Sequence, residues 1–458
     1  MRRETATRHC RRAALLLLVG LLAAGAGCSR RLMLSPAMFH GTAADPFAEL
    51  PADQRKTGAA VFYATDRNGN LGGAGQDYGV ERGDALMLGR VDIEIGADRG
   101  LDWDGLIQRT VGPRGTARPV LTFAPADEFG PLLTTAPPRV VRRETANGQD
   151  PEALQVQFMP RRDPGRAAFR FADALNAEMA ATGHAELYVY VHGYFNSFDD
   201  ALETTASLHH YNGRRGAVIA FSWPSASNLF DYLEDRESAQ FAVSDLRQLL
   251  IFLADHTDAQ RINLVAHSMG CFLTSNAMRE LRLLGFEQSP HEIQTRFKID
   301  HVVFVAPDID ADVLQKRYFR EGFHHVARRL TLYTSPEDQA LLWATRLLYG
   351  ITRAGSITGD YLSDNQKLWL RAHPEVTFVD ITGQKTVGLG HAHHTDNPGV
   401  ASDLLLMLAH DLEPAERGLV LLPDVPIWGF PKGYEEAVQQ IAEREYPLRE
   451  NVEVTQRP

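Results

Sequence analysis

Six short apolar runs recur between residues 186 and 381, each rich in Val, Ile, Leu, Phe and Tyr. They cover 186–191, 217–222, 261–266, 301–306, 329–334 and 376–381. Continuous apolar runs of this length are typical of strands buried on both faces of a parallel sheet. Helix-length amphipathic segments lie between most of the runs, at 198–211, 233–256, 269–284 and 336–348.

A helical pattern at 167–181 precedes the first run, and another at 399–410 follows the last. Strands that alternate with helices imply an α/β fold, in which helices cover both faces of a mostly parallel central sheet. The pattern therefore predicts an α/β core over residues 166–412.

The pattern is less regular outside this core. Apolar residues at 59–65 and 85–95 predict two strands, so we expect residues 57–165 to form a β-rich N-terminal portion packed on the core. Residues 28–56 carry Pro, Gly and Ala without periodicity, which predicts a tether. The Pro-rich residues 413–458 form a C-terminal extension, with one short helix expected near 434–443.

The first 27 residues have the architecture of a secretory signal. A basic start is followed by an apolar stretch at 13–26, which is too short for a comfortable membrane span. Cys28 directly follows small residues, and this arrangement resembles a bacterial lipoprotein signal, in which the cysteine is acylated and becomes the new N-terminus. Ser29 then points to the outer membrane. Plain secretion and a retained anchor are the alternatives.

The net charge bears on the kind of partner, and the cysteine content bears on disulfide bonding. The net charge is −11 without a basic stripe, which argues against nucleic acid as a partner. A membrane link would depend on the acyl anchor, because an acidic chain is not attracted to anionic lipid heads. The three cysteines give no disulfide framework. Of these, Cys271 is expected to be a small buried packing residue.

The candidate chemistry begins at residues 266–270, Ala-His-Ser-Met-Gly, between an apolar run and a helical pattern. A serine at such a strand-to-helix turn, with small residues two before and two after it, is typical of the nucleophile elbow of hydrolases. The common pattern starts with glycine, whereas Ala266 stands here. Ser268 is therefore the candidate nucleophile, and an ordinary buried turn is the alternative.

A serine nucleophile needs a base and an acid that orients the base, in the chain order Ser, Asp or Glu, His. Asp308 and Asp310 follow the run at 301–306, and Asp338 follows the run at 329–334. The acid usually follows the strand two after the nucleophile strand, so Asp338 is the candidate. For Asp308 and Asp310 we expect turn formation and helix capping.

The base should lie on the loop after the last strand, where His391, His393 and His394 compete. A metal site is an alternative there, because His-x-His-x-x-Asp looks like part of a dinuclear zinc hydrolase signature. That signature places Asp two residues after the second His, where Thr395 stands. We therefore expect no metal ligand set at this loop.

An oxyanion must also be stabilised by backbone N–H groups that already point at it. One donor would be the amide of Met269, which follows the nucleophile. The other usually lies just past an earlier strand, and the His-Gly turn before Tyr194 fits that position.

These residues together resemble a bacterial family of alpha/beta hydrolases of unknown function within the esterase/lipase superfamily. The resemblance covers roughly residues 57–410. It rests on the segments 61–67, 191–198, 221–224, 266–270, 306–310 and 332–341. In that family a Gly-His pair, closely followed by two aromatics and a proline, ends the core. Gly390, His391 and Pro398 match this spacing, with His393 and His394 in place of the aromatics. The resemblance thus implies an alpha/beta-hydrolase-like fold with His391 as the base, and residues 221–224 at the pocket edge or in the core.

The expected activity is hydrolysis of a small-molecule or lipid carboxylic ester by Ser268, His391 and Asp338, without a cofactor. Esters are favoured over amides through the resemblance alone. An acyltransferase with the same three residues, or a non-catalytic envelope lipoprotein that uses the fold for binding, are the alternatives. The lipid-anchored chain is expected at the outer membrane.

Overall fold

The computed structural model describes residues 30–69, 78–111, 118–135, 140–142, 154–156, 162–226, 231–347, 350–384 and 390–449. The expected signal sequence and the expected acylation site Cys28 lie outside these residues. So do residues 385–389, just before the histidine-bearing loop.

The strands of the main sheet are β1 (Gly58–Gly69), β2 (Tyr78–Ile95), β3 (Leu121–Phe123), β4 (Asp127–Pro131), β9 (Glu186–Val191), β10 (Ala217–Ser222), β11 (Arg261–His267), β12 (Ile299–Val305), β13 (Arg329–Thr334), β14 (Val376–Asp380), β15 (Val420–Leu421) and β16 (Trp428–Gly429). Their order is β15-β16-β14-β13-β12-β11-β9-β10-β1-β2-β3, with β4 beside β2. All neighbouring pairs from β1–β10 across to β14–β16 are parallel. β2 runs antiparallel to β1, β3 and β4. Two small sheets pair β5 (Leu133–Thr135) with β8 (Arg162–Pro164), and β6 (Val140–Arg142) with β7 (Leu154–Val156).

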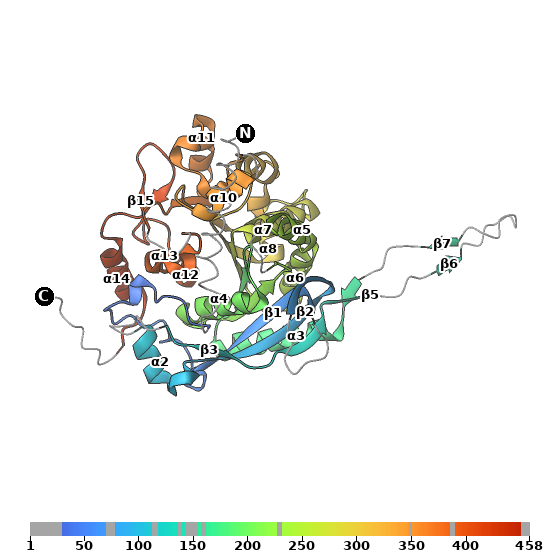
Figure 1. Cartoon of the computed structure of the whole chain (residues 1–458), viewed down its shortest axis with the longest axis horizontal. Helices are drawn as coiled ribbons and strands as arrows, with labels where there is room; N and C mark the ends of the chain where they lie inside the picture. The colour runs from blue at the N-terminus through green and yellow to red at the C-terminus, as the bar shows by residue number, and fades with distance from the viewer. Residues whose placement is uncertain are drawn as a thin grey trace, which may run out of the picture.

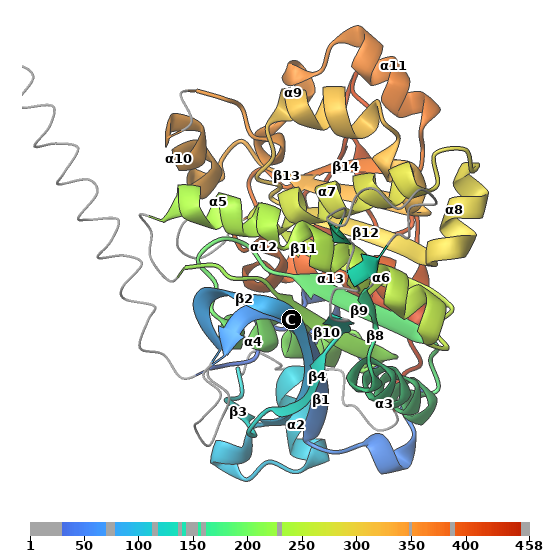
Figure 2. The ribbon, with the colours of Figure 1, turned by 90° about the vertical axis from the view of Figure 1, so that its right-hand side faces the viewer.

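The helices are α2 (Trp103–Thr110), α3 (Arg166–Thr182), α4 (Phe198–Tyr211), α5 (Tyr232–Phe241), α6 (Val243–His256), α7 (Met269–Leu284), α8 (Pro290–Phe297), α9 (Ala311–Val313), α10 (Gln339–Leu347), α11 (Asp364–Ala372), α12 (His393–Asp396), α13 (Pro398–His410) and α14 (Tyr434–Glu445). Short helical turns are η1 (Ala37–Phe39), η2 (Ala52–Gln54), η3 (Ala97–Arg99), η4 (Leu314–Phe319), η5 (Phe323–Val326), η6 (Ala354–Ser356) and η7 (Gly359–Tyr361). Figures 1 and 2 show helices on both sides of the sheet: α5, α6, α7 and α8 lie in front of it in Figure 2, and α4, α12 and α13 behind.

Alternate residues of the central strands enter two separate cores. Val189 and Leu264 face the core that α3, α6 and α7 cover, whereas their neighbours Tyr188 and Val265 face the core of α4 and α13. The period of two in a strand sends successive side chains to opposite faces. Because both faces of the sheet are buried, the sequences of these strands are continuous apolar runs. The expected α/β fold with a mostly parallel sheet is confirmed.

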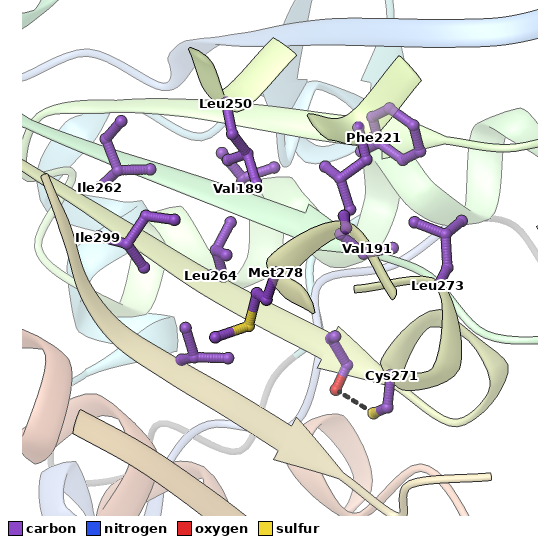
Figure 3. Close-up of a cluster of buried hydrophobic side chains, with 14 of the residues drawn as sticks. Val189, Val191, Phe221, Leu250, Ile262, Leu264, Cys271, Leu273, Met278 and Ile299 are labelled. Carbon is purple, nitrogen blue, oxygen red and sulfur yellow. Dashed lines mark hydrogen bonds between the residues drawn. The ribbon is translucent and has the colours of Figure 1, made fainter. Parts of the chain in front are cut away.

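The first core lies directly under the Ser268 turn. Figure 3 shows side chains of β9, β11, β12 and α7 packed together, with Cys271 among them. The expectation that Cys271 is a buried packing residue is confirmed, because its side chain is inaccessible and its thiol donates to the Ala266 carbonyl at 3.2 Å. Burial also raises the pKa of this thiol well above its ordinary value.

The tether predicted for 28–56 is wrong for most of its described part. Leu32, Met38, Phe39 and Phe47 are almost inaccessible and belong to the second core. The segment has no periodic pattern because its backbone is mostly irregular, yet its apolar side chains still bury against α13 and α14. The β-rich portion is likewise continuous with the core, since β1 pairs directly with β10 in the main sheet.

The C-terminal extension also packs on the core. Its helix α14 contacts η1 and α13, so segments from the two ends of the chain lie side by side. A buried ion pair joins Arg417 of the extension to Asp403 of α13, with Nε and Oδ1 2.7 Å apart. Tyr333 of β13 donates to the other oxygen of Asp403 at 2.5 Å.

One predicted helix, 233–256, is divided in two. α5 ends at Phe241 and α6 begins at Val243, and both helices contact α7. The small buried side chain of Ala242 lets the chain bend between them close to the core. Among the helices that the structure describes, none is both long enough and apolar enough to cross a lipid bilayer.

Candidate active site

Ser268 occupies a strained turn between β11 and α7. Its φ of 54° and ψ of −119° lie outside the regions that side-chain-bearing residues ordinarily adopt. The turn is held from two sides, because the Ser268 N–H donates to Val305 O at 2.9 Å and the Asp308 N–H donates to Ser268 O at 3.1 Å. Strain of this kind persists where the surrounding structure enforces it, as at functional turns.

The small residue at position 270 is a geometric requirement. A Cβ on Gly270 would lie 2.4 Å from His192 O and 2.6 Å from Val191 O. The crossing backbone therefore leaves no room for a side chain, as the sequence pattern predicts. Gly193, just after the end of β9, lies against the same turn, and a Cβ on it would lie 2.9 Å from Ser268 Cβ.

His391 and Asp338 are joined by a hydrogen bond in which Nδ1–H donates to Oδ2 at 2.7 Å. Asp338 is buried, with 1 % of its side chain exposed, and its other oxygen accepts the Leu341 N–H at 3.0 Å at the start of α10. One oxygen of Asp338 thus caps α10, while the other orients the imidazole of His391. Because Nδ1 carries the proton, Nε2 of His391 is the ring atom that can accept one.

The charge environment favours the protonated form of His391. Burial acts most strongly and lowers the pKa of His391, but the negative charge of Asp338, its hydrogen bond and the charge of Asp308 together raise that pKa above its ordinary value. Burial lowers the pKa of His394 to about 3, with help from the neighbouring histidines, and lowers that of His393 as well. Of the three loop histidines, only His391 is therefore poised to hold a proton.

His393 and His394 have different surroundings from His391. His394 Nε2 lies 3.2 Å from the hydroxyl of Tyr190 on β9, away from Asp338. His393 is buried in the short helix α12. Within the described chain, the nitrogens of His391, His393 and His394 do not form a set that converges on one metal position.

His267 connects the elbow to the histidine loop. Its Nε2–H donates to the carbonyl of His391 at 3.1 Å, and the two rings are 4.7 Å apart. The residue next to Ser268 thus contacts the residue that bonds Asp338, so the His391 loop packs against the elbow at the carboxyl edge of the sheet. Among the described residues, no hydrogen bond to the Ser268 hydroxyl is present, and such bonds are often long before substrate binds.

The loop that carries Tyr194 is held by Arg67, whose role the sequence did not reveal. Arg67 lies at the end of β1 with 1 % exposure. Its guanidinium donates to Ser222 Oγ at 2.9 Å, to Gly79 O at 3.0 Å and to Asn196 O at 2.7 Å. The only signal in the sequence was a basic residue at the end of the motif at 61–67, directly after an apolar run and two polar residues.

Trp223 stabilises the same loop. Its indole Nε1–H donates to His192 O at 2.8 Å, and its ring stacks on the His192 imidazole. Phe221, Ser222 and Trp223 are all inaccessible, so this motif lies in the core rather than at an exposed pocket edge. Gly193 and Tyr194 are thereby kept next to the Ser268 turn.

Turn formation and helix capping were expected for Asp308 and Asp310, and the structure confirms this for Asp310 but not for Asp308. Asp310 caps α9 by accepting the N–H groups of Asp312 and Val313, as expected. Asp308, however, forms a buried ion pair with Arg353, 2.5 Å between Oδ1 and Nε, and accepts the Tyr232 hydroxyl at 2.7 Å. A turn residue was expected because the sequence could not show that Arg353, 45 residues later, returns to this position.

The chain has recognisable similarity to known proteins. It is 26 % identical over 147 residues to an uncharacterized protein of Nostoc sp. (strain PCC 7120), a match that covers 27 % of this chain and 38 % of that protein's length. A predicted CIB-like hydrolase from Thermoplasma acidophilum is 14 % identical, with a TM-score of 0.28 over 50 % of this chain and 86 % of the other. An esterase from Pyrobaculum calidifontis is 14 % identical, with a TM-score of 0.21 over 57 % and 75 % of the two chains.

A family model gives the broadest match. It aligns with residues 167–409, which is more than half of the chain and includes Ser268, Asp338 and His391. The sequence resemblance to this family is thus confirmed, and the chain belongs to the family described as alpha/beta hydrolase of unknown function (DUF900).

Proposed function

We propose that the protein is a serine hydrolase that cleaves carboxylic esters through Ser268, His391 and Asp338. The observation that carries the proposal is the hydrogen bond between His391 and Asp338, made beside the strained Ser268 turn. A nucleophile, a base and an acid in this order are the arrangement by which hydroxyl groups are activated in alpha/beta hydrolases.

In the proposed reaction, Ser268 Oγ attacks the ester carbonyl while its proton passes to His391 Nε2. The charge of Asp338 stabilises the imidazolium that forms. The proton then moves to the leaving alcohol, and the carbon–oxygen bond to that alcohol breaks. Water attacks the acyl-serine with His391 as base, which releases the acid and restores Ser268.

The developing oxyanion would be stabilised by the amides of Met269 and Tyr194. Met269 begins α7, so its N–H belongs to the free amino end of a helix, where negative charge is favoured. The proximity of Gly193 to Ser268 Cβ supports the second donor, since Tyr194 is the next residue. Every group in this scheme belongs to the chain, and no cofactor is required.

A fluorophosphonate probe tests the nucleophile, followed by a series of p-nitrophenyl esters of graded acyl length. Ser268→Ala should abolish labelling and reduce turnover by at least about a thousandfold. Ser244→Ala is the matched control, because Ser244 is an exposed serine on α6 and should label and turn over like wild type. Wild-type protein that neither labels nor hydrolyses any ester would contradict the proposal and favour a binding module.

An acyltransferase would use the same residues with an alcohol in place of water. Turnover that rises in added alcohol or lysolipid, with transfer product replacing free acid, would favour that reaction. The present proposal expects free acid as the main product under both conditions.

We also propose that Cys28 is acylated and anchors the protein at the outer membrane. The proposal rests on the signal-like residues 1–27 and on Ser29. Metabolic labelling with a palmitate analogue should mark the wild type and not Cys28→Ala, and the label should fractionate with the outer membrane.

A further inference from the structure

A cluster of three ligand-type side chains lies at the sheet edge opposite Ser268. His324 belongs to η5, which precedes β13, while His373 and Glu375 lie between the end of α11 and the start of β14. β13 and β14 are parallel neighbours, so the segments that enter them meet at the amino edge of the sheet. The Ser268 and Asp338 turns instead follow the carboxyl ends of β11 and β13.

The ligand atoms of this cluster converge. One nitrogen of each histidine and one oxygen of Glu375 lie within 4.8 Å of one another. Glu375 Oε1 is 4.0 Å from His324 Nε2 and 2.8 Å from His373 Nδ1. Ligands about 2.1 Å from a tetrahedral ion stand about 3.4 Å apart, so these distances bracket the spacing that a bound zinc ion requires.

His324 is the strongest indication that something is bound there. Its side chain is 2 % exposed, and neither ring nitrogen has a hydrogen-bond partner among the described residues. A buried polar group without a partner is costly, and natural structures rarely retain one without a reason.

We propose that His324, His373 and Glu375 bind a divalent transition-metal ion of the zinc class. Two imidazoles and one carboxylate form a donor set that suits zinc, with a fourth position left for water. The side chains of His373 and Glu375 are 29 % and 32 % exposed, which gives the ion a path from solvent.

The ion would link two segments of the chain at this edge of the sheet. It would join the segment before β13 to the segment before β14, which already meet through the ring contacts of His324 with Trp369 and His373. Arg282 is the nearby cation that opposes binding, but its guanidinium is held by the carbonyls of Gly285, Phe286 and Gln288. The negative charge of Glu375 offsets this repulsion.

Trp369 provides a direct readout of the site. Its indole stacks on His373 with 4.1 Å between ring centroids, and it meets His324 edge to face at 5.3 Å. A Co²⁺ ion bound by both histidines would quench Trp369 fluorescence and give the visible absorption of tetrahedral cobalt. Trp369→Phe should lose most of the quenching and keep the absorption.

The test is titration of the metal-stripped full-length chain, purified without a polyhistidine tag, with Co²⁺ and then Zn²⁺. Wild type should bind one equivalent of Co²⁺ that Zn²⁺ displaces, and its Tm should rise with Zn²⁺. His373→Ala and Glu375→Gln, both at half-exposed positions, should weaken binding by at least about 100-fold, since even partners behind the ligands cost 10–100-fold. His291→Ala, an exposed histidine on the adjacent α8, is the matched control and should bind like wild type.

Absence of saturable binding in wild type, or equal affinity in His373→Ala and Glu375→Gln, would overturn the site. Ser268→Ala should bind the ion as wild type does. Metal binding and ester hydrolysis are therefore tested independently.

Discussion

Nδ1 of His391 lies 2.7 Å from Oδ2 of Asp338, although 53 residues separate the two in the chain. The bond determines the tautomer of the imidazole and leaves Nε2 as the proton acceptor. It also couples the charge of Asp338 to the proton affinity of His391, and this coupling can be measured.

Activity should rise with pH through the pKa of His391. A general base must be neutral to accept a proton, and the pKa of His391 is raised above its ordinary value of 6.5 by Asp338 and Asp308 against the opposing effect of burial. The acid limb of kcat/KM should therefore have its midpoint above 6.5. A midpoint clearly below that value in a pH profile would be inconsistent with this electrostatic arrangement.

Asp338→Asn should both lower ester turnover and move this acid limb. Loss of the carboxylate removes the charge that raises the pKa of His391, so the acid limb should shift to lower pH. Turnover should fall by about 10⁴-fold, as in other triads that lose the acid. Glu337→Gln, at the adjacent exposed acid, is the control and should leave the limb in place. If Asp338→Asn kept the wild-type limb, Asp338 would not be the partner of the base.

His391→Ala and His394→Phe should separate the base from its neighbours. His391→Ala should lose at least about a thousandfold in turnover. His394→Phe keeps an aromatic ring beside Tyr190 but cannot transfer a proton, so it should retain most of the activity. The reverse pattern in p-nitrophenyl ester assays would assign the base to His394.

Gly193→Ala should disturb the turn without removing a reactive group. The new methyl would lie 2.8 Å from His267 Nδ1 and 2.9 Å from Ser268 Cβ, so the loop or the serine must move. A displacement of about 1 Å can cost about 100-fold in rate, so kcat should fall by that order. Gly79→Ala is the control, because its methyl would lie 3.6 Å from the nearest atom, Asn68 O, which is ordinary contact. Unchanged kcat in Gly193→Ala would show that the approach is not tight.

Arg417→Ala should destabilise the fold through the buried charge of Asp403. Both members of this pair are almost inaccessible, so removal of one should cost about 3–5 kcal/mol in free energy of unfolding. Arg444→Ala is the matched control in the same extension, because its exposed pair with Glu445 is worth only about 0–1 kcal/mol. Urea unfolding of the two variants measures both values, and equal effects would contradict the buried-pair argument.

The sequence by itself determined the central α/β layer and the position of the elbow. Strands such as Glu186–Val191 and Ala217–Ser222 have the bounds that the apolar runs predict, because continuous burial on both faces leaves a local signal. The small residue at Gly270 was also readable, since the requirement arises from a tight turn within a few residues.

Only the tertiary structure decided which distant groups meet. The irregular segment that contains Phe39 and Phe47 was expected to be a tether and is buried, because irregular backbone leaves no periodic pattern for its apolar side chains. The pairing of Asp308 with Arg353, the support of the Tyr194 loop by Arg67, and the convergence of His324 with His373 and Glu375 were equally hidden. Local patterns report the face on which a side chain lies, whereas contacts between side chains depend on how the strands are ordered in the sheet.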